Sequence, residues 1–405
     1  KKSVDDVIRK RFGGTDFGTL SNQFNRSFVK EIQDLRSEAQ ETVEAPDSFT
    51  SSPNSAYLPS MTEQDLSDIL KRMPLTKPEG YDRIRIRDIY HNFDKLKNIL
   101  LAILNGIIET GRIPDMLKVA LVRPIYKKGN QKLVSNYRPI AILSVVSQIM
   151  EKFVSKIMRS FCEKFSLLNS CQYGFRQHKS TTLLLEDFTD YIHEKIENNH
   201  VVLALFLDLR KAFDTIDHGL LLDKLTNMGF RGPFLQFFEN YFHNRTQRVR
   251  IGGSISEPLS VTSGVPQGSI LGPLLFNIYI NDLDKLSLNS QLYQYADDTA
   301  IVLAHKNYED AVSILQSDIN KLVDWFSWNY IFVNKTKTNL MCFRTHQKRV
   351  NLIRPVYLHS TDCKSCDCSP LVYATETTYL GITFDECLTW SAHVENLVKR
   401  LRMVL

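Results

Sequence analysis

Apolar residues recur along the chain with two periods, which distinguish predicted helices from predicted strands. An apolar residue stands at about every fourth position in residues 144–168 and again in residues 308–328, as in amphipathic helices. Residues 201–207 are apolar without a break, which is typical of a strand buried on both faces. Short apolar segments in residues 292–303 and 331–343 predict two hairpins. The order of helices and strands favours an α+β fold.

Local signals place several further elements before the buried strand. Residues 1–45 have the composition of polar helices, and residues 46–60 are rich in Ser and Pro, as in a linker. Thr62-x-x-Asp65 has the spacing of a capping box, so a short helix should begin there. Another helix is expected over residues 93–109 and a strand over residues 119–126.

The composition limits the class of protein. Of the 405 residues, 43% are hydrophobic and 23% are charged, as in ordinary globular chains that bury a core. The longest apolar run is far too short to span a bilayer. The chain begins with Lys1 and has no apolar leader, so we expect a fragment of a longer protein without a signal peptide. Seven cysteines fit a reducing compartment better than a disulfide scaffold.

The net charge of +5 is small, but the cations are unevenly distributed. Residues 116–150 and 327–361 contain several Lys and Arg and no Asp or Glu, and Arg245, Arg248 and Arg250 form a third cluster. Cations gathered without acids indicate binding of a polyphosphate, hence a nucleic acid or a nucleotide. Each cluster by itself could also be an ordinary solvated face; three clusters favour the binding interpretation.

Two acidic segments are the candidate chemistry. Asp208 ends the buried strand, where an unpaired carboxylate is costly, and Asp297 and Asp298 are adjacent at the predicted hairpin tip. If the two strands are neighbours, Asp208 and Asp297 can bind the same cations, as two-metal phosphoryl transfer requires. A polar turn for the Asp pair and a helix cap for Asp208 are the structural alternatives. Neither segment decides the matter alone.

A series of blocks, in order over roughly residues 60–400, resembles the reverse transcriptases of non-LTR (LINE-type) retrotransposons, in particular the jockey-like group. The blocks are Ile113-Pro114-Asp115, Pro124-Ile125-Tyr126-Lys127-Lys128-Gly129, Asn136-Tyr137-Arg138-Pro139-Ile140, Gln172-Tyr173-Gly174-Phe175-Arg176, the segment from Phe206 to Asp214, Gly264-Val265-Pro266-Gln267-Gly268-Ser269, Tyr295-Ala296-Asp297-Asp298, Asn334 to Thr338, and Tyr379-Leu380-Gly381.

This resemblance implies a right-hand polymerase with fingers and palm, an antiparallel palm sheet backed by helices, and a thumb that is truncated because the chain stops near its start. The implied divisions are an N-terminal extension and linker (1–60), N-terminal helices and fingers (61–200), the palm segment with the first Asp (201–219), an insertion between fingers and palm (220–262), the rest of the palm (263–387) and the start of the thumb (388–405).

The resemblance also assigns roles. Asp208, Asp297 and Asp298 are the implied catalytic residues; together with the backbone carbonyl of Leu209 they would hold two Mg²⁺ ions, which Mn²⁺ could replace. Phe213 corresponds to the bulky ring that blocks a ribose 2′-OH. The implied nucleotide-binding residues are Lys127, Lys128, Arg138, Phe213, Gln267, Gly268 and Lys337. For these, a core aromatic, a solvated basic loop, an ordinary turn and an exposed lysine are the structural alternatives.

The implied activity is RNA-directed DNA synthesis. The partners would be an RNA template, a DNA primer and dNTPs, without a membrane, and the location intracellular, in nucleus and cytoplasm, as a retrotransposon ribonucleoprotein. The alternatives are a catalytically inactive RNA-binding relic of a decayed element and an RNA-dependent RNA polymerase. The first would be expected to have lost a catalytic Asp, and all three are present.

Two segments depart from the family pattern or suggest other chemistry. Arg83 stands where the family's loop at residues 77–84 has Gly, which predicts a changed backbone path. Cys363, Cys366 and Cys368 have part of the spacing of a zinc site, but Zn²⁺ takes four ligands and no second cluster stands at a suitable distance. A reduced surface loop is the favoured interpretation of these cysteines.

Overall fold

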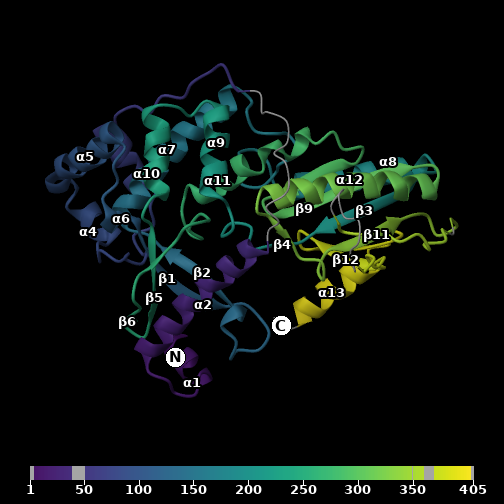
Figure 1. The fold of residues 1–405 in the computed structure, drawn as a ribbon, viewed down its shortest axis with the longest axis horizontal. Helices are drawn as coiled ribbons and strands as arrows, with labels where there is room; N and C mark the ends of the chain where they lie inside the picture. The colour runs from purple at the N-terminus through teal and green to yellow at the C-terminus, as the bar shows by residue number, and fades with distance from the viewer. Residues whose placement is uncertain (1–3, 39–50, 349, 360–368, 403–405) are drawn as a thin grey trace. The chain divides into compact units, whose positions relative to one another are not determined.

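The computed structural model describes residues 4–38, 51–348, 350–359 and 369–402, which form two compact units (Figure 1). Unit 1 comprises described residues up to 167 together with 213–279, and unit 2 comprises 168–212 and the described residues from 280 onward. Both units combine helices with sheets, so the predicted α+β class is confirmed at this level. Cys363, Cys366 and Cys368 lie outside the described residues.

The core of unit 2 is an antiparallel sheet in the order β11-β3-β9-β8. The strands are β3 (Val201–Leu207), β8 (Gln291–Tyr295), β9 (Asp298–His305) and β11 (Asn339–Phe343). Every residue of β3 is buried, as its unbroken apolar run predicts. Strands β8 and β9 form the first predicted hairpin, which is confirmed.

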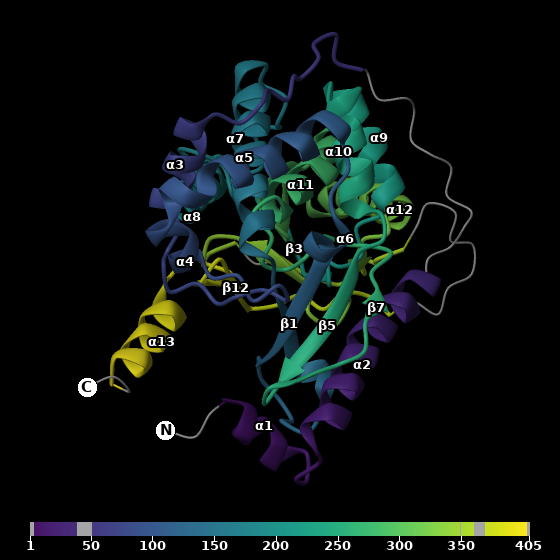
Figure 2. The ribbon, with the colours of Figure 1, turned by 90° about the vertical axis from the view of Figure 1, so that its left-hand side faces the viewer.

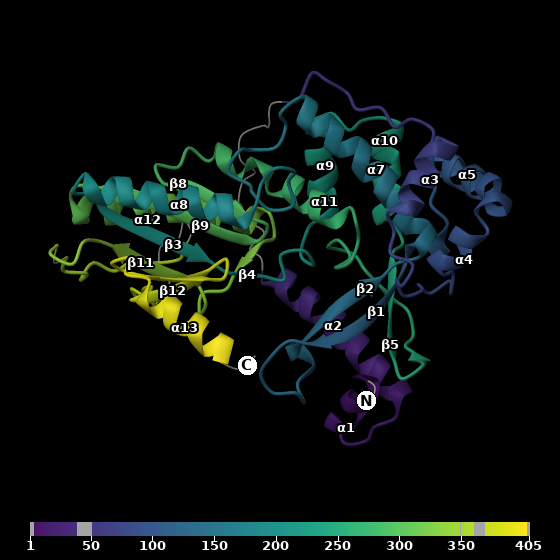
Figure 3. The same ribbon diagram turned by 180° about the vertical axis from the view of Figure 1, so that it is seen from behind.

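Helices α8 (Thr181–Glu197) and α12 (Tyr308–Trp328) run along this sheet (Figure 3). Phe188 of α8 enters an aromatic cluster with even-numbered residues of β3 and with the hairpin of β12 (Glu376–Tyr379) and β13 (Ile382–Asp385). Its ring centroid lies 5.4 Å from that of Phe384. The inward face predicted for α12 is buried throughout. The last described helix, α13 (Ser391–Arg402), packs against β13 and has no buried residue.

The second predicted hairpin, at residues 331–343, is wrong. Strand β10 (Phe332–Val333) pairs with β4 (Leu209–Arg210), and β11 pairs with β3, so the two segments share no ladder. Their partners β3 and β4 are consecutive in the chain, with Asp208 between them. The turn between β10 and β11 lies beside Asp208, whose carbonyl accepts a hydrogen bond of 2.7 Å from the Asn334 amide. The pairing partner is distant in sequence, which a local pattern does not specify.

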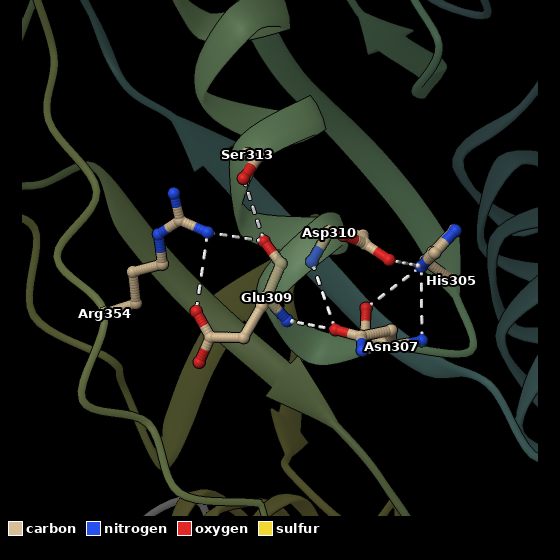
Figure 4. Close-up of polar contacts among 6 residues, drawn as sticks. All are labelled: His305, Asn307, Glu309, Asp310, Ser313 and Arg354. Atoms are coloured by element: carbon tan, nitrogen blue, oxygen red, sulfur yellow. Dashed lines mark hydrogen bonds and ion pairs between the residues drawn. The ribbon is translucent and has the colours of Figure 1, made fainter.

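The start of α12 is fixed by its capping residue (Figure 4). The Asn307 side chain accepts hydrogen bonds from the amides of Glu309 at 2.7 Å and Asp310 at 3.2 Å. Arg354 donates to the carbonyl of Glu309 at 2.8 Å, which joins the described segment 350–359 to the same helix end. The two bonds to Asn307 satisfy amide groups at the N-terminus of the helix that the helix itself cannot satisfy.

Unit 1 contains a second sheet, in which β1 (Val119–Tyr126) pairs antiparallel with β2 (Tyr137–Ile142) and parallel with β5 (Thr246–Ile251). The short strands β6 (Ser254–Ile255) and β7 (Leu259–Ser260) also pair with β5. Residues 119–126 form the strand that their pattern predicts. The parallel β1–β5 pair joins segments more than a hundred residues apart, which places β5 beside the β1–β2 hairpin.

Helix α2 (Phe17–Ser37) lies along β5 (Figure 2) and covers one face of this sheet together with α1 (Val4–Arg11). Leu20 and Phe24 are fully buried, and the rings of Phe24 and Tyr137 meet edge to face at 5.1 Å. The described N-terminal residues are therefore mainly helical, as predicted, and α2 contributes buried side chains to the core of unit 1.

The other helices of unit 1 largely follow the local signals. The capping box at Thr62 begins a helix, and Gly111, at φ +64°, ends another. The helix predicted over residues 144–168 ends earlier, at Lys164, because Ser166 takes a left-handed conformation. These helices are α3 (Glu63–Lys71), α4 (Ile86–His91), α5 (Phe93–Thr110), α6 (Asp115–Lys118), α7 (Val145–Lys164), α9 (His218–Met228), α10 (Pro233–Phe242) and α11 (Gly272–Tyr279), with 3-10 turns at Val134–Asn136 and, in unit 2, Asn281–Lys285.

The loop before α4 is held against the start of α7. Asp82 accepts a hydrogen bond of 2.5 Å from Ser144, and a side chain at Gly80 would come within 2.8 Å of the Ser144 amide nitrogen. Arg83 has φ +59°, the left-handed conformation that glycine favours. Arg83 thus takes a backbone conformation that glycine favours, at the position where the family has Gly. The changed path of the loop stays a prediction.

None of the helices in the described ranges combines the length and the apolar character needed to cross a bilayer.

Candidate active site

The sheet of unit 2 brings the predicted carboxylates together. Strands β3 and β9 are antiparallel neighbours, and Leu207 pairs with Thr299. Asp208, one residue after Leu207, and Asp298, one residue before Thr299, therefore lie at the same end of the sheet. Asp297 occupies the tight turn between β8 and β9, where Tyr295 pairs with Asp298. The condition that the sequence argument required, two adjacent strands carrying the two acidic segments, is therefore met.

The charges of these acids affect one another. Asp298 as a whole residue is exposed, but its carboxyl group is largely shielded from water. This desolvation raises the pKa of the carboxyl group to about 6, and repulsion from Asp297 and Asp208 adds to the shift. The Lys337 ammonium lies 3.4 Å from a carboxylate oxygen of Asp208 and partly offsets this negative charge. Excess negative charge of this kind favours a bound cation.

The donor set suits a hard divalent cation, since carboxylate oxygens are the ligands that Mg²⁺ prefers, with substrate phosphates and water completing its shell. No three His, Cys, Asp or Glu side chains in the described part of the chain form a ready-made metal site. The three Asp side chains share one end of the sheet without closing around a common point.

The shifted carboxyl group makes a prediction for stability in the absence of divalent cations. Between about pH 4 and pH 6, folded Asp298 retains a proton that the unfolded chain releases, so the free energy of unfolding should fall as the pH rises through this window. Asp298→Asn removes this titration. The gain in unfolding free energy of this variant over wild type should therefore be larger at pH 7 than at pH 4. Urea unfolding at several pH values measures the effect.

Asp94→Asn is the control for that series, because the Asp94 side chain is 95% exposed. A difference between wild type and Asp298→Asn that does not change between pH 4 and pH 7 would contradict the assignment of the shift to Asp298.

A second block of the sequence supports the carboxylate turn. The Gln172 side-chain oxygen accepts hydrogen bonds from the amides of Gly174 at 2.6 Å and Ala296 at 2.9 Å, and Ala296 has φ +56°. A Cβ atom at Gly174 would lie 2.3 Å from the Ala296 nitrogen. Gln172 and Gly174 therefore fix the backbone of the turn that carries Asp297, a role that sequence reasoning missed although it noted the block.

The segment with Lys337 is also tied to Asp208. Asn334 donates from its amide to the Asp208 carbonyl, and the Asn334 carbonyl accepts from the amides of Lys337 at 3.1 Å and Thr338 at 3.0 Å. Leu209 follows Asp208 directly and pairs with Val333. Unit 2 thus gathers the candidate metal ligands and one candidate nucleotide-binding residue, Lys337.

The remaining predicted site residues belong to unit 1. Gln267 donates from its side chain to an Asp214 carboxylate oxygen at 2.6 Å, and its carbonyl accepts from the Ala141 amide at 2.8 Å. Gly268 has φ +128°, and a Cβ atom there would lie 2.3 Å from the Ala141 carbonyl oxygen, so the backbones touch. Phe213 stacks on Phe276 with ring centroids 4.5 Å apart. Asp214 was part of a noted block, but sequence reasoning gave it no role.

The three predicted triphosphate ligands lie on or beside the β1–β2 hairpin of unit 1. Lys127 and Lys128 follow β1 and are exposed, and Arg138 pairs with Ile125 across the hairpin. Because cross-strand partners share a face, Arg138 lies on the face of the sheet opposite α2, together with Arg123. The structure thus brings these cations together at one hairpin.

Comparison with known proteins gives a consistent result. Residues 125–384 match the sequence family described as "Reverse transcriptase (RNA-dependent DNA polymerase)". The chain is 28% identical over 345 residues to "Probable RNA-directed DNA polymerase from transposon BS" of Drosophila melanogaster, covering 83% of this chain and 37% of the relative. It is 27% identical over 368 residues to "RNA-directed DNA polymerase from mobile element jockey" of the same species, covering 87% and 38%.

A third relative, "Probable RNA-directed DNA polymerase from transposon X-element" of Drosophila melanogaster, is 27% identical, over 84% of this chain and 36% of the relative. The chain therefore spans somewhat more than a third of the length of these relatives. The resemblance indicated by the ordered sequence blocks is confirmed.

Proposed function

Because the chain belongs to the reverse transcriptase (RNA-dependent DNA polymerase) family, we propose that it synthesises DNA on an RNA template as the polymerase of a non-LTR retrotransposon. The observation that carries this proposal is the convergence of Asp208, Asp297 and Asp298 at one end of an antiparallel sheet. An inactive relic would be expected to have lost one of them.

In the proposed reaction, the 3′-OH of a primer loses its proton to solvent and attacks the α-phosphate of a dNTP. A new P–O bond forms, the bond from the α-phosphorus to the α,β-bridging oxygen breaks, and pyrophosphate leaves. Asp208 and Asp297 would hold two Mg²⁺ ions, with Asp298 as a weaker ligand and the Leu209 carbonyl as an additional one. When bound, such ions stabilise negative charge on the attacking and leaving oxygens. The Lys337 ammonium, 3.4 Å from an Asp208 carboxylate oxygen, would donate to the departing phosphates.

In this proposal the protein groups act mainly by positioning and charge neutralisation. Lys127, Lys128 and Arg138 grip the triphosphate; Arg138 suits this because its planar guanidinium binds phosphate oxygens bidentately. Gln267, held by Asp214, lies near the nucleotide, and Gly268 lies beside the primer–template pair. The sheet of unit 2 is the palm, the β1–β2 hairpin belongs to the fingers, and α13 begins the thumb.

Phe213 is proposed to block the ribose 2′-OH, and its packing on Phe276 would hold the ring in place. Phe213→Ala should raise the efficiency of rNTP incorporation relative to dNTP by about tenfold or more, because the steric block is removed. Single-nucleotide extension with dATP and ATP measures the ratio. Phe12→Ala, which removes a ring that packs on Phe24 in the same unit, should leave it unchanged.

That ratio also separates a DNA polymerase from an RNA polymerase. Wild-type protein that uses ATP as efficiently as dATP would contradict the proposed substrate.

The face of the unit 1 sheet opposite α2 is proposed to contact the template. Arg123 and Arg250 each follow the last pair of the β1–β5 ladder, Val122 with Val249. Burial and the charge of Arg123 lower the pKa of Arg250, and Glu79, 3.9 Å from its guanidinium, opposes this shift. Next to them, a pocket of about 350 Å³ is lined by Tyr81, Asp82, Arg83, Met116, Arg248 and Ile255. Clustered guanidinium groups beside an aromatic ring suit the phosphates and bases of a single strand.

Affinity for RNA should therefore fall with rising salt and vary little with sequence. The Arg248 guanidinium lies over the Tyr81 ring, 5.0 Å from its centroid, so Arg248→Ala should weaken binding of unrelated RNAs alike and reduce the salt slope by about one phosphate contact. Fluorescence anisotropy at several salt concentrations measures both quantities. Arg85→Ala is the control, since that exposed side chain pairs with Asp88; an equal loss in both variants would contradict the assignment.

The experiment that tests the function is primer extension by the 405-residue chain on an RNA template annealed to a DNA primer, with dNTPs and Mg²⁺. Extension supports the proposal, and RNA binding without extension supports the relic. In the full-length protein, we propose that this polymerase works in a retrotransposon ribonucleoprotein in nucleus and cytoplasm.

A further inference from the structure

A buried carboxylate to which the sequence analysis gave no role lies in the interior of unit 1. Glu151, on α7, is 1% exposed, and burial raises the pKa of its carboxyl group. Removing an ionisable group from water costs several kcal/mol unless hydrogen bonds compensate. The structure supplies these bonds from two segments that are distant from α7 in the sequence.

Three donors reach this carboxylate. The Tyr241 hydroxyl donates to one oxygen at 2.6 Å, and the other oxygen accepts from the Ser269 hydroxyl at 3.1 Å and from the Ile270 amide at 2.7 Å. Arg245 is also buried; its guanidinium lies over the Tyr241 ring at 4.6 Å and donates to the Tyr241 carbonyl at 3.1 Å. We call Glu151, Tyr241, Arg245 and Ser269 the Glu151 network.

The network holds the end of one particular loop. Ser269 and Ile270 directly follow residues 264–268, the glycine loop, which contains Gln267 and Gly268. The Ser269 oxygen in turn accepts from the amides of Leu271 and Gly272, both at 3.1 Å, where α11 begins. The glycine loop is therefore fixed to Glu151 at its C-terminal end, at the point where it enters α11.

The other end of the glycine loop is fixed by backbone contacts. The Gly264 amide donates to the Ile216 carbonyl at 2.7 Å, and the Val265 amide donates to the Phe213 carbonyl at 2.8 Å. The middle is held by Ala141 and Asp214 through Gln267. The start and the middle of the glycine loop are thus fixed. The bonds from Ser269 and Ile270 to Glu151 then determine how far Gln267 and Gly268 can still move.

We propose that Glu151 is a positioning residue that acts through Ser269 and Ile270 on the glycine loop and thereby sets the affinity for the incoming nucleotide. This inference rests on the proposed function, in which Gln267 and Gly268 lie at the nucleotide and the primer–template pair. Glu151 itself touches neither. A carboxylate serves here because its two oxygens accept three hydrogen bonds at once, which no apolar side chain can do.

The test is steady-state extension by one nucleotide, with the next correct dNTP as the probe. Ser269→Ala and Glu151→Ala should each raise the KM for the dNTP by about tenfold, the effect of roughly one lost hydrogen bond to a charged group, with kcat little changed. The dNTP Kd on a dideoxy-terminated primer should rise in parallel. Glu151→Gln should restore most of the affinity, because its amide oxygen still accepts from Ile270 and its NH₂ can donate to Tyr241.

Asn25→Ala is the matched control for a purely structural effect. Asn25 is 1% exposed in the same unit and donates to the Glu257 carbonyl at 2.8 Å, but its hydrogen bonds do not reach the glycine loop. If Glu151→Ala and Asn25→Ala lose similar melting temperature and have the same KM, the inference is overturned. Ser269→Ala, which deletes a single oxygen atom, keeps the inference testable if Glu151→Ala does not fold.

Gln267→Ala separates this inference from the proposed function. If Gln267→Ala raises the KM but neither Ser269→Ala nor Glu151→Ala does, the role of Glu151 is wrong and the proposed loop function stands. If Gln267→Ala leaves the KM unchanged, the glycine loop is not at the nucleotide. The proposed role of the loop and the role of Glu151 are then both wrong.

Discussion

Replacing Asp208 or Asp297 with asparagine should abolish primer extension while template binding stays nearly intact. Both residues lie at one end of the sheet formed by β3, β8 and β9, and asparagine keeps their size but removes the negative charge that cations require. We expect activity to fall by about three orders of magnitude or more, because the reaction depends on charge neutralisation at the phosphates. Single-turnover extension and RNA anisotropy measure the two quantities separately.

Asp310→Asn is the control for these variants, since Asp310 lies in the first turn of α12 at another place in unit 2. It should extend primers as wild type does. Full activity in Asp208→Asn or Asp297→Asn would contradict the catalytic assignment, whereas loss of RNA binding in both would indicate a folding defect and not a catalytic role.

Gly174→Ala should reduce extension by about 100-fold, even though Gly174 is not a candidate ligand. The added Cβ atom would lie 2.3 Å from the Ala296 nitrogen, so the turn that carries Asp297 must move. A displacement of about 1 Å at reacting groups is enough for a loss of this size. The loss should appear in kcat, since the binding surfaces of unit 1 are unchanged.

Gly106→Ala is the matched substitution. Gly106 lies within α5, and an added Cβ would have no atom within 4 Å apart from the adjacent backbone of its own helix, so alanine there should be neutral or slightly stabilising. Wild-type activity in Gly174→Ala would show that the turn tolerates movement and that its position does not limit catalysis.

Local patterns predicted the elements whose formation depends on local sequence. Residues 201–207 form β3, residues 308–328 form α12, and the capping box at Thr62 begins a helix. The failure at residues 331–343 has a physical cause: β10 and β11 pair with β4 and β3, more than a hundred residues away, and apolar alternation does not identify a partner.

The candidate site was predictable to a similar extent. The sequence alone shows an acid at the end of a buried strand and an acid pair at a hairpin tip. The ordered blocks indicated that both segments belong to one catalytic site. The supports of the site were not visible. Gln172 reaches the turn at Ala296, and Glu151 reaches Ser269, through contacts between segments more than a hundred residues apart. Only the fold brings these side chains together.

The central claim, that the two acidic segments hold the same divalent ions, can be tested without relying on catalysis. Fe²⁺ can replace Mg²⁺ in such oxygen-rich sites, and with ascorbate and peroxide it cuts the backbone close to where it is bound. We predict two groups of cuts, one near Asp208 and one near Asp297 and Asp298, both suppressed by added Mg²⁺ and by Asp208→Asn. Cuts near only one segment, or cuts that Asp208→Asn leaves unchanged at the β8–β9 turn, would contradict a shared site.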